Sequence, residues 1–396
     1  MPHTFDIYSE QILNYQLSGQ ELEGLKETLA TPEETAERHL RYAKRRNAKA
    51  IIIFGAGDGR LVKILAEKKS AEQEFIICDL YPEHIRLLNK YGFDKIKENS
   101  NSSLLTDSSI WALLLLLIQN GYSATDSHLI LNPDLDGKSK SKHQNLQKLF
   151  SGTKQIEPPT HTSLCKISAA AILSPDEPEL KDFINNFPDW IDEIVLVWDC
   201  SGSEIVPELN EFHRAEIINV RHPLETNFSA QRNRMLENCS GEWIIYLDAD
   251  ERLSEESWES MRPLTSFEDC NGWYLPRMTF YPDHEHCRVG YGLWPDLQLR
   301  IFKNNPNLKF INKIHEQLTG LEGASGILPH CPIQHLTHLL KSREKIESKL
   351  DNFNRSTDGH FNHRLGNEFP HIPNQLLSPR KGNKIGALLL PDINMS

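Results

Sequence analysis

The chain has 396 residues, of which 39% are hydrophobic and 25% are charged, and its formal net charge is −12. This composition is typical of a globular protein and excludes a disordered or fibrous one, and the length allows two domains or more. The negative charge disfavours non-specific binding to nucleic acid, so we expect no nucleic-acid partner. An anionic ligand would need a metal ion or local basic residues.

The cysteines and the apolar runs bear on the compartment. The seven cysteines include no CxxC pair, which argues against a zinc site or a disulfide framework and favours a reducing environment. The first residues lack the basic-then-apolar order of a signal peptide. The longest apolar run, residues 110–118, is too short to cross a bilayer and predicts a buried helix. We expect a cytoplasmic protein without a transmembrane segment, which is compatible with peripheral contact at the inner face of the membrane.

The first part of the chain predicts a Rossmann-like αβ domain. Residues 1–45 are charged and are predicted to be helical, and the domain is expected at residues 46–157. The apolar run at 51–54 is typical of a strand buried on both faces of a parallel sheet. An amphipathic helix follows, and a second strand at 75–78 ends at Asp79. Together these elements predict one βαβ unit.

A glycine-rich turn follows the first of these strands. Gly55, Gly57 and Gly59 open the helix, and Asp79 lies about twenty positions later, a spacing that suits a cofactor beside the backbone and a carboxylate on its ribose. The unit resembles the first βαβ unit of class I methyltransferases, which implies S-adenosylmethionine as a cofactor. Residues 132–135 are only faintly similar to the catalytic loop of that class. Tight packing of helix on strand also selects such glycines, so the alternative is a degenerate or recognition domain without cofactor.

The second half of the chain predicts a second, separate parallel α/β sheet. The lysine–serine stretch at 138–142 indicates a surface loop, and the proline pair at 158–159 a linker. The second domain is expected at residues 162–355, followed by a loosely ordered tail at 356–396. Its strands are predicted at 166–173, 193–198, 215–220 and 243–247, and its helices at 179–187 and 229–239.

An acidic cluster follows the last of these strands. Asp248 and Asp250 lie one residue apart, next to Glu251, just beyond the carboxyl end of the strand, where open α/β sheets bind ligands. Two such carboxylates can converge on one hard cation, Mg²⁺ or Mn²⁺, whose shell is completed by water and substrate phosphates. Taken alone, the motif is also compatible with an acidic turn that is exposed to solvent and binds no metal.

Five segments in the same order resemble the family 2 glycosyltransferases, over roughly residues 165–345. The similarity is greatest to the branch that includes lipopolysaccharide-core and peptide-modifying members. It implies a GT-A fold and a metal-dependent, inverting transfer of sugar from a nucleotide-diphosphate donor, most simply a UDP-sugar, to a glycan, lipid-linked or protein acceptor. The segments are DEIVLVWDCSGS at 192–203, NFSAQRN at 227–233, GEWIIYLDADE at 241–251, LRIFKN at 299–304 and IHE at 314–316.

The resemblance also implies roles for single residues. Asp199 would hydrogen-bond the nucleotide base or ribose. Asp250 would be the direct metal ligand, with Asp248 as a second ligand or turned to the ribose. Arg232 would reach a phosphate, or else form a surface salt bridge. His315 would lie on the acceptor side.

The inverting reaction requires a carboxylate that takes the proton of the acceptor hydroxyl. Glu316 and Asp296 are the candidates, and we favour Glu316 because His315 beside it could bind the metal or orient substrate. One departure from the family concerns the turn at 172–177, which reads Ile-Leu-Ser-Pro-Asp-Glu where the family has a Lys-Asn-Glu-like turn. Two other functions stay open, one suggested by the glycine-rich turn and one by this altered turn. One is a bifunctional glycosyltransferase and methyltransferase, and the other is a non-catalytic protein that binds nucleotide-sugars on a GT-A scaffold.

Overall fold

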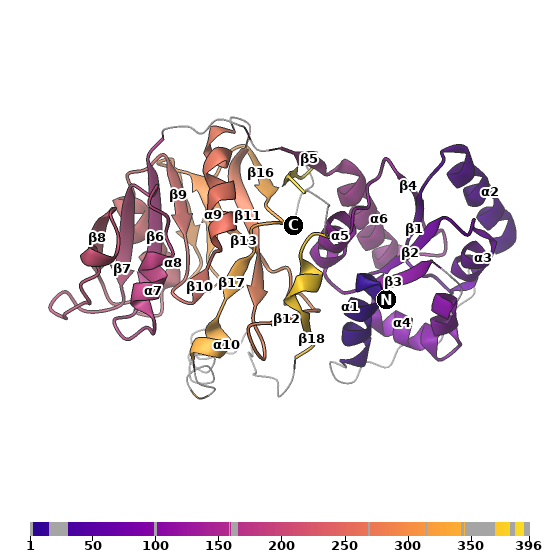
Figure 1. The fold of residues 1–396 in the computed structure, drawn as a ribbon, viewed down its shortest axis with the longest axis horizontal. Helices are drawn as coiled ribbons and strands as arrows, with labels where there is room; N and C mark the ends of the chain where they lie inside the picture. Colours follow the sequence, from indigo (N-terminus) through magenta and orange to yellow (C-terminus); the bar gives the residue numbers. More distant parts are fainter. Residues whose placement is uncertain are drawn as a thin grey trace.

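In the described residues, the computed structural model shows two large sheets with helices packed on them and two small two-stranded sheets (Figure 1). Parts of two predicted segments lie outside the described residues: 1–2 and 16–30 of the N-terminal helical segment, and 356–368, 381–384 and 392–396 of the tail. The described residues are 3–15, 31–98, 101–157, 159, 165–267, 270–313, 315–341, 344, 369–380 and 385–391.

The first part of the chain forms a parallel α/β unit, called here the N-terminal unit. In the described ranges its four strands lie in the order β3-β2-β1-β4, and every neighbouring pair is parallel. β1 is buried along its whole length because helices cover both faces of the sheet: Ile51 and Ile53 pack toward α2 and α3, and Ile52 and Phe54 toward α5 and α6. The elements are α1 (Thr4–Asn14), α2 (Pro32–Arg45), β1 (Ala50–Phe54), α3 (Arg60–Lys68), β2 (Glu74–Asp79), α4 (Pro82–Asn89), η1 (Phe93–Glu98), β3 (Ser102–Thr106), α5 (Ile110–Gln119), β4 (Ser127–Leu131) and α6 (Gly137–Gly152).

Two predictions about helices in this unit had different outcomes. The apolar run at 110–118 is α5, whose residues 112–117 are fully buried, so that prediction is confirmed. The lysine–serine stretch at 138–142 is helical and belongs to α6, which corrects the predicted loop. His143, Leu146, Leu149 and Phe150 bury the inner face of α6, so packing decides its structure where local composition suggested a loop. Within the described ranges, no helix combines the length and apolar composition needed to cross a bilayer.

The second sheet is mixed, which corrects the predicted purely parallel sheet. Strands β9, β6, β7 and β8 form a parallel block, as expected, but β13 is antiparallel to β9 and β11 is antiparallel to β13. β13 returns against β11 without a crossover helix, and a parallel return would require one. The elements are β5 (Lys154–Ile156), β6 (Ile167–Leu173), α7 (Leu180–Asn185), β7 (Glu193–Trp198), η2 (Asn210–Phe212), β8 (Glu216–Arg221), α8 (Phe228–Asn238), β9 (Trp243–Tyr246), β10 (Glu251–Arg252), α9 (Glu255–Met261), η3 (Arg262–Ser266), β11 (Cys270–Thr279), β12 (His286–Arg288), β13 (Leu297–Lys303), β14 (Lys309–Ile311), β15 (Gln317–Thr319), β16 (Ala324–Ile327), β17 (Ile333–His335), α10 (Thr337–Leu340), β18 (His371–Pro373), η4 (Asn374–Leu377) and β19 (Ala387–Leu389).

The predicted tail supplies strands to the fold, so its described part is not loosely ordered. β18 pairs with β12, and β19 lies between β16 and β5. Ala387 and Leu388 are fully buried, which accounts for the order of this short strand. β5 precedes the expected domain boundary, yet it joins the second sheet through β19.

One hydrophobic cluster, called here the shared core, continues from the N-terminal unit into the second sheet. It contains buried residues of α1, α5 and α6 together with Met278 of β11, Trp294 before β13 and Ile372 of β18. A second cluster fills the space between the parallel block and α7 and α9. The two parts therefore pack directly on one another, as the arrangement of α5, β12 and β18 in Figure 1 also shows.

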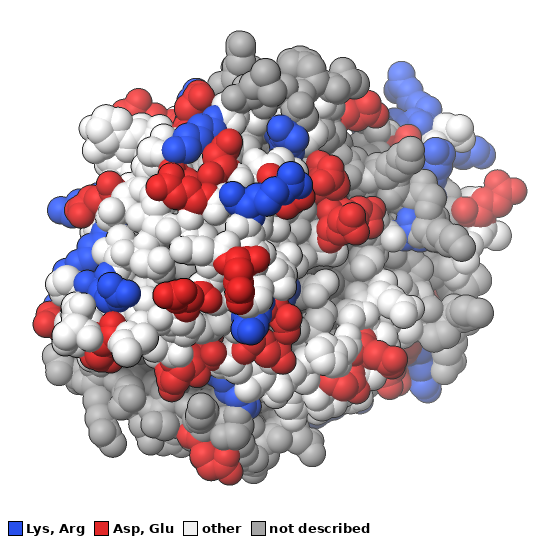
Figure 2. Space-filling view, turned by 60° about the vertical axis from the view of Figure 1, so that its left-hand side comes forward, with Lys and Arg blue, Asp and Glu red and all other residues white. Residues whose placement is uncertain are grey.

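The described part of the face seen in Figure 2 shows no continuous patch of basic side chains. Asp and Glu outnumber Lys and Arg by 55 to 43, and the two kinds are interspersed over the described part of this face. Recognition of an anionic ligand would therefore depend on a local group of cationic side chains. Cationic side chains of this kind lie at the acidic turn after β9.

Candidate functional site

The acidic turn is held rigidly at the carboxyl end of β9. The Glu251 amide donates to the Asp248 carbonyl at 2.9 Å, and the Asp248 amide donates to Glu251 Oε2 at 3.1 Å. The Asp250 carbonyl accepts from the Leu336 amide at 2.8 Å. β10 starts at Glu251 and pairs antiparallel with β17, so that Glu251 lies opposite His335. The turn thus lies at the sheet edge where α/β folds bind ligands, with β17 beside it.

Asp248 is clamped between two arginines. Arg232 Nη2 lies 2.9 Å from Asp248 Oδ1, and Arg300 Nη2 lies 2.8 Å from Oδ2. Both guanidinium groups stack on the Tyr246 ring, at 4.6 and 4.5 Å from its centre. Burial alone would raise the pKa of Asp248, but Arg300 and Arg232 outweigh it and hold that pKa well below its usual value. A metal ion at Asp248 would have to compete with both arginines, so the geometry favours an orienting role for this acid.

A second part of the same network reaches Asp296. Arg300 Nη2 also lies 2.7 Å from Glu251 Oε1, and Arg277 Nη1 lies 3.4 Å from the same oxygen. Arg277 donates twice to Asp296 Oδ2, from Nε at 2.8 Å and from Nη2 at 2.5 Å. Burial raises the pKa of Glu251; Arg300 opposes the shift and Asp248 adds to it. Ion pairs among Arg300, Glu251, Arg277 and Asp296 thus connect the acidic turn to the loop that precedes β13.

The two predicted catalytic bases differ in how their oxygens are engaged. Glu316 Oε1 accepts from Arg232 Nε at 2.7 Å, and no hydrogen bond to Oε2 is found among the described residues. Asp296 accepts from Arg277 twice on Oδ2 and from Gln298 at 2.8 Å on Oδ1. Glu316 therefore keeps more capacity to accept a proton or a hydroxyl group.

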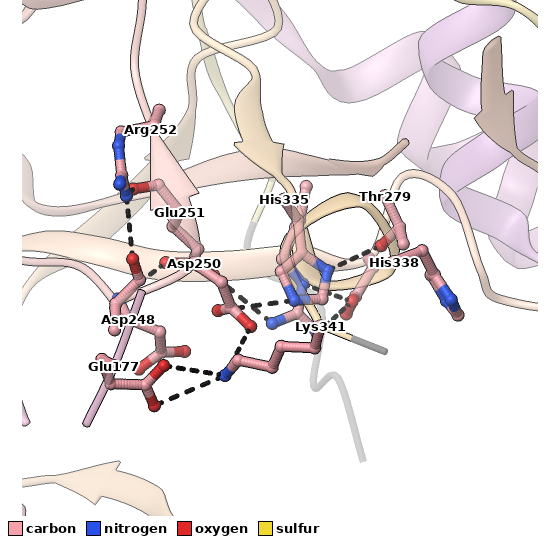
Figure 3. Close-up of polar contacts among 12 residues, drawn as sticks. Glu177, Asp248, Asp250, Glu251, Arg252, Thr279, His335, His338 and Lys341 are labelled. Atoms are coloured by element: carbon pink, nitrogen blue, oxygen red, sulfur yellow. Dashed lines mark hydrogen bonds and ion pairs between the residues drawn. The ribbon is translucent and has the colours of Figure 1, made fainter. Parts of the chain in front are cut away.

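Asp250 faces an imidazole on one side and an ammonium group on the other (Figure 3). Its side chain is 8% exposed. Its Oδ1 lies 3.7 Å from His335 Nε2, while His335 Nδ1 lies 2.9 Å from the Thr279 hydroxyl, which orients the ring. Its Oδ2 lies 3.4 Å from Lys341 Nζ, and that ammonium group lies 3.1 Å from Glu177 Oε2. Lys341 therefore joins the turn after β6 to the turn after β9.

Asp199 and His315, two predicted substrate residues, lie on loops beside the arginine network. Asp199 follows β7 and accepts the Leu224 amide on Oδ1 at 2.7 Å, so it shapes the loop after β8 at the same edge of the sheet. His315 is exposed between β14 and β15, in a left-handed backbone conformation with φ of 54°. The imidazole of His335 faces Asp250. The role of His315 on the acceptor side stays a prediction, and the choice of Glu316 rests on its Oε2, to which no hydrogen bond is found in the described ranges.

Sequence reasoning missed His335 and Lys341 and gave no role to Arg300. His335 and Lys341 belong to no local motif, and only the pairing of β10 with β17 brings their segment to Asp250. Arg300 carried a usable signal, because it is a charged residue inside the apolar strand β13 and is 2% exposed. A buried arginine needs a buried carboxylate, which Asp248 and Glu251 provide.

The glycine-rich turn of the N-terminal unit is closed by the chain itself. A Cβ atom built at Gly55 would lie 2.5 Å from Leu135 Cδ1, and one built at Gly57 would lie 2.6 Å from Asn132 Nδ2. Gly59 has φ of 85° and is the N-cap of α3. The first two glycines thus allow the close approach of residues 132–135 to the turn.

Asp79 is fully buried, and backbone donors engage both of its oxygens. Oδ2 accepts from the Ala56 amide at 2.7 Å, and Oδ1 accepts from the Tyr81 amide at 2.8 Å. With no exposed surface, Asp79 does not present its carboxylate to a ribose. Gly55, Gly57 and Asp79 thus have structural contacts in the turn after β1, and binding of S-adenosylmethionine at the predicted set with Gly59 has no support.

Calorimetric titration of the protein with S-adenosylmethionine should accordingly show no saturable heat, because Leu135 and Asn132 occupy the space beside the glycines. The Leu135→Ala variant, which removes one of these side chains, serves as the matched control. Saturable binding to the unaltered protein would show that residues 132–135 open and would restore the cofactor hypothesis.

Residues 177–316 match the family model described as glycosyl transferase family 2. The resemblance to this family found in the sequence is thereby confirmed over these residues, which contribute strands β7, β9 and β13 to the second α/β sheet. The chain is similar to the SPbeta prophage-derived glycosyltransferase SunS of Bacillus subtilis, with 27% identity over 179 residues, 44% of this chain and 38% of that protein. It is also similar to a TPR repeat-containing protein of Synechococcus elongatus, with 24% identity over 154 residues, 39% of this chain and 36% of that protein.

The chain thus spans only 36% and 38% of the lengths of these two relatives. Among solved structures, it resembles S. aureus TarS with a TM-score of 0.27 and 17% identity, over 35% of this chain and 28% of that one. It resembles GalNAc-T7, solved with UDP, GalNAc and Mn²⁺, with a TM-score of 0.29 and 10% identity, over 45% and 44%. TM-scores of this size do not establish a common arrangement of the site.

Proposed function

We propose that the protein is a glycosyltransferase that moves a sugar from a nucleoside diphosphate, most simply UDP, to an acceptor hydroxyl with inversion. The observation that carries the proposal is the position of Asp250, within the residues that match family 2, between His335 and Lys341. The acceptor class is a glycan, a lipid-linked sugar or a protein side chain, and the expected location is cytoplasmic. We also propose the domain limits expected from the sequence, in which a Rossmann-like N-terminal unit extends to residue 157.

The residues around Asp250 fit a divalent cation that shares its shell with substrate. Asp250 Oδ1 and His335 Nε2 face one another at 3.7 Å, and Thr279 holds the other nitrogen of the ring, as outer partners of metal-bound histidines do. The described residues contain no group of three or more potential ligands, so water and diphosphate oxygens would have to complete the shell. A bound Mn²⁺ or Mg²⁺ would supply positive charge to the leaving diphosphate.

Lys341 supports an anionic ligand at the same place. The turn after β6 carries Asp176 and Glu177, and it lacks the lysine and asparagine of the family turn. Burial lowers the pKa of Lys341, but Asp250 and Glu177 outweigh that effect and raise it, so the group stays charged. The Lys341 ammonium group lies near Glu177 and so provides positive charge at the turn after β6, which has no lysine of its own.

The remaining residues are assigned by their position in the network. Asp199 and Asp248 would accept hydrogen bonds from the nucleoside, and Arg232 would hold Asp248 and Glu316 in place. Glu316 would take the proton of the acceptor hydroxyl while the acceptor oxygen bonds to the anomeric carbon and the bond to the diphosphate oxygen breaks. Asp296 is the second candidate for this role.

The Glu316→Gln variant is expected to lower turnover by roughly 10² to 10⁴, the range that a general base contributes, without weakening UDP binding. The measurement is UDP release from UDP-glucose and UDP-N-acetylglucosamine, beside calorimetry with UDP and Mn²⁺. The same change at exposed Glu322 should alter neither quantity. Full turnover in Glu316→Gln, with a loss in Asp296→Asn, would move the base to Asp296.

The non-catalytic alternative rests on the altered turn after β6. It predicts that the protein binds UDP with Mn²⁺ but releases no UDP from any nucleotide-sugar, with or without acceptor extracts. UDP release that depends on Glu316 excludes it.

A further inference from the structure

Helix α1 lies in the seam between the N-terminal unit and the second sheet (Figure 1). It is bonded to β3, because the Ser9 hydroxyl donates to the Leu104 carbonyl at 2.8 Å and accepts from the Thr106 amide at 3.0 Å. On its other side, Tyr8 and Ile12 belong to the shared core and are fully buried. α1 is therefore part of the N-terminal unit and faces the transferase domain directly.

The loop at residues 289–296 is linked to Tyr8 of α1 through Asp107 and approaches α1 directly at Gly290. The Tyr291 amide donates to Asp107 Oδ1 at 3.1 Å, and the Tyr8 hydroxyl donates to the other oxygen, Oδ2. Gly290 has φ of 79°, and a Cβ atom there would collide with the side chain of Ile12. The loop approaches the helix so closely that only glycine fits at this position.

A third contact closes the end of α1. Arg86 Nη2 of α4 donates to the Tyr291 hydroxyl at 2.8 Å, and the single hydrogen of that hydroxyl is shared between the carbonyls of Tyr15 and Ile12, at 2.9 and 3.1 Å. Arg86 Nε donates to the Leu13 carbonyl at 2.9 Å. These donors satisfy carbonyl groups that the last turn of a helix leaves open, so Tyr291 is fixed by the helix end itself.

The far end of the same loop leads into the transferase site. Trp294 is fully buried and meets the Tyr8 ring edge-on at 6.2 Å. Two residues later, Asp296 is held by Arg277, which also reaches Glu251 in the acidic turn. The loop thus spans the distance from Asp107 in the N-terminal unit to the network that holds Asp248.

We propose that the N-terminal unit is the positioning module of the transferase site, and that Tyr8 and Asp107 act as positioning residues by holding loop 289–296. The loop in turn holds Asp296 against Arg277. This assigns a function to a unit whose glycine-rich turn is filled by its own chain. It rests on the proposed function for its effect on turnover, while the structural coupling can be measured without substrate.

The Tyr8→Phe variant tests the proposal, because it removes one hydroxyl group and keeps the ring beside Trp294. The matched control is Tyr122→Phe, which removes the buried hydroxyl that donates to Glu74 Oε2 at 2.6 Å in the same unit. The first measurement is hydrogen–deuterium exchange of the free protein, read on peptides from residues 286–303. The second is UDP release from UDP-glucose and UDP-N-acetylglucosamine, with calorimetry of UDP and Mn²⁺ beside it.

Tyr8→Phe is expected to speed amide exchange around Tyr291 and Asp296, whereas Tyr122→Phe leaves these amides unchanged. Turnover should fall roughly tenfold to a hundredfold in Tyr8→Phe, as displacement of positioned groups does, with UDP affinity retained. Equal exchange in both variants, or no change in residues 286–303, would overturn the coupling. If no variant and no wild-type sample releases UDP, the proposed function fails, and the exchange result still decides the inference.

Discussion

The Asp250→Asn variant should lose about a thousandfold in turnover while the protein stays folded. Charge neutralisation at a leaving group contributes several kcal/mol, and each 1.4 kcal/mol changes a rate about tenfold. The amide retains the shape of the carboxylate but loses the charge that faces His335 and Lys341. The measurements are UDP release from UDP-sugars with Mn²⁺ present and calorimetry of Mn²⁺ and UDP binding, with a thermal melt as the check on folding.

The same substitution at Asp283 provides the control. Asp283 is an exposed acid that pairs with His286, away from the acidic turn, and Asp283→Asn should leave turnover unchanged. A folded Asp250→Asn protein with full turnover would exclude Asp250 from the reaction and would favour a site built on the arginine network alone.

The Arg300→Met variant should lower the free energy of unfolding by about 3–5 kcal/mol, the usual cost of removing one partner of a buried ion pair. Arg300 is 2% exposed, and it is bound to Asp248 Oδ2 and to the fully buried Glu251. Methionine fills much of the space but leaves both carboxylates close together without that cation. Urea unfolding of the variant and the wild type gives the difference.

The loss in Arg300→Met should also grow with pH. Burial already raises the pKa of Glu251 and Arg300 opposes that shift, so without the arginine the pKa rises further. An acid whose pKa is higher in the folded than in the unfolded state destabilises the fold as pH rises through that interval. The control is Arg214→Met, which breaks an exposed pair with Asp189 and should have no measurable effect. A small, pH-independent change in Arg300→Met would contradict the buried pair as a source of stability.

Local sequence patterns predicted the parts of the site that follow directly on strands. The apolar run before Asp248 forms β9, and the acidic turn follows it as expected. The structure also brings together Arg232, Asp248 and Glu316, which the sequence resemblance had named separately. Each of these residues lies within a few positions of a strand or helix end, where local pattern defines the position well.

The rest of the site depends on contacts between distant segments. His335 reaches Asp250 because β17 pairs with β10, and Lys341 reaches Glu177 across 164 positions of sequence. Neither segment carries periodicity or a motif that indicates its partner. The closure of the turn at Gly55 and Gly57 is of the same kind, because it is Leu135 and Asn132 that fill it.

The mixed sheet and the ordered C-terminal strands were missed for a related reason. β19 is a three-residue strand whose order comes from its two neighbours, β16 and β5, and from the burial of its side chains. Such a strand is too short to show alternation in the sequence. Its direction, like that of β13, follows from the connections around it.

The position of β19 has a consequence for how the chain can be divided. β5 comes from one side of the expected boundary and β16 from the other, and β19 bonds to both, while the shared core continues across the seam. A fragment that begins after residue 157 would lose β5 and the α1 side of the shared core, and β19 would become an exposed edge that favours aggregation. We therefore expect the two sequence domains to unfold together, so that the intact chain melts in a single transition.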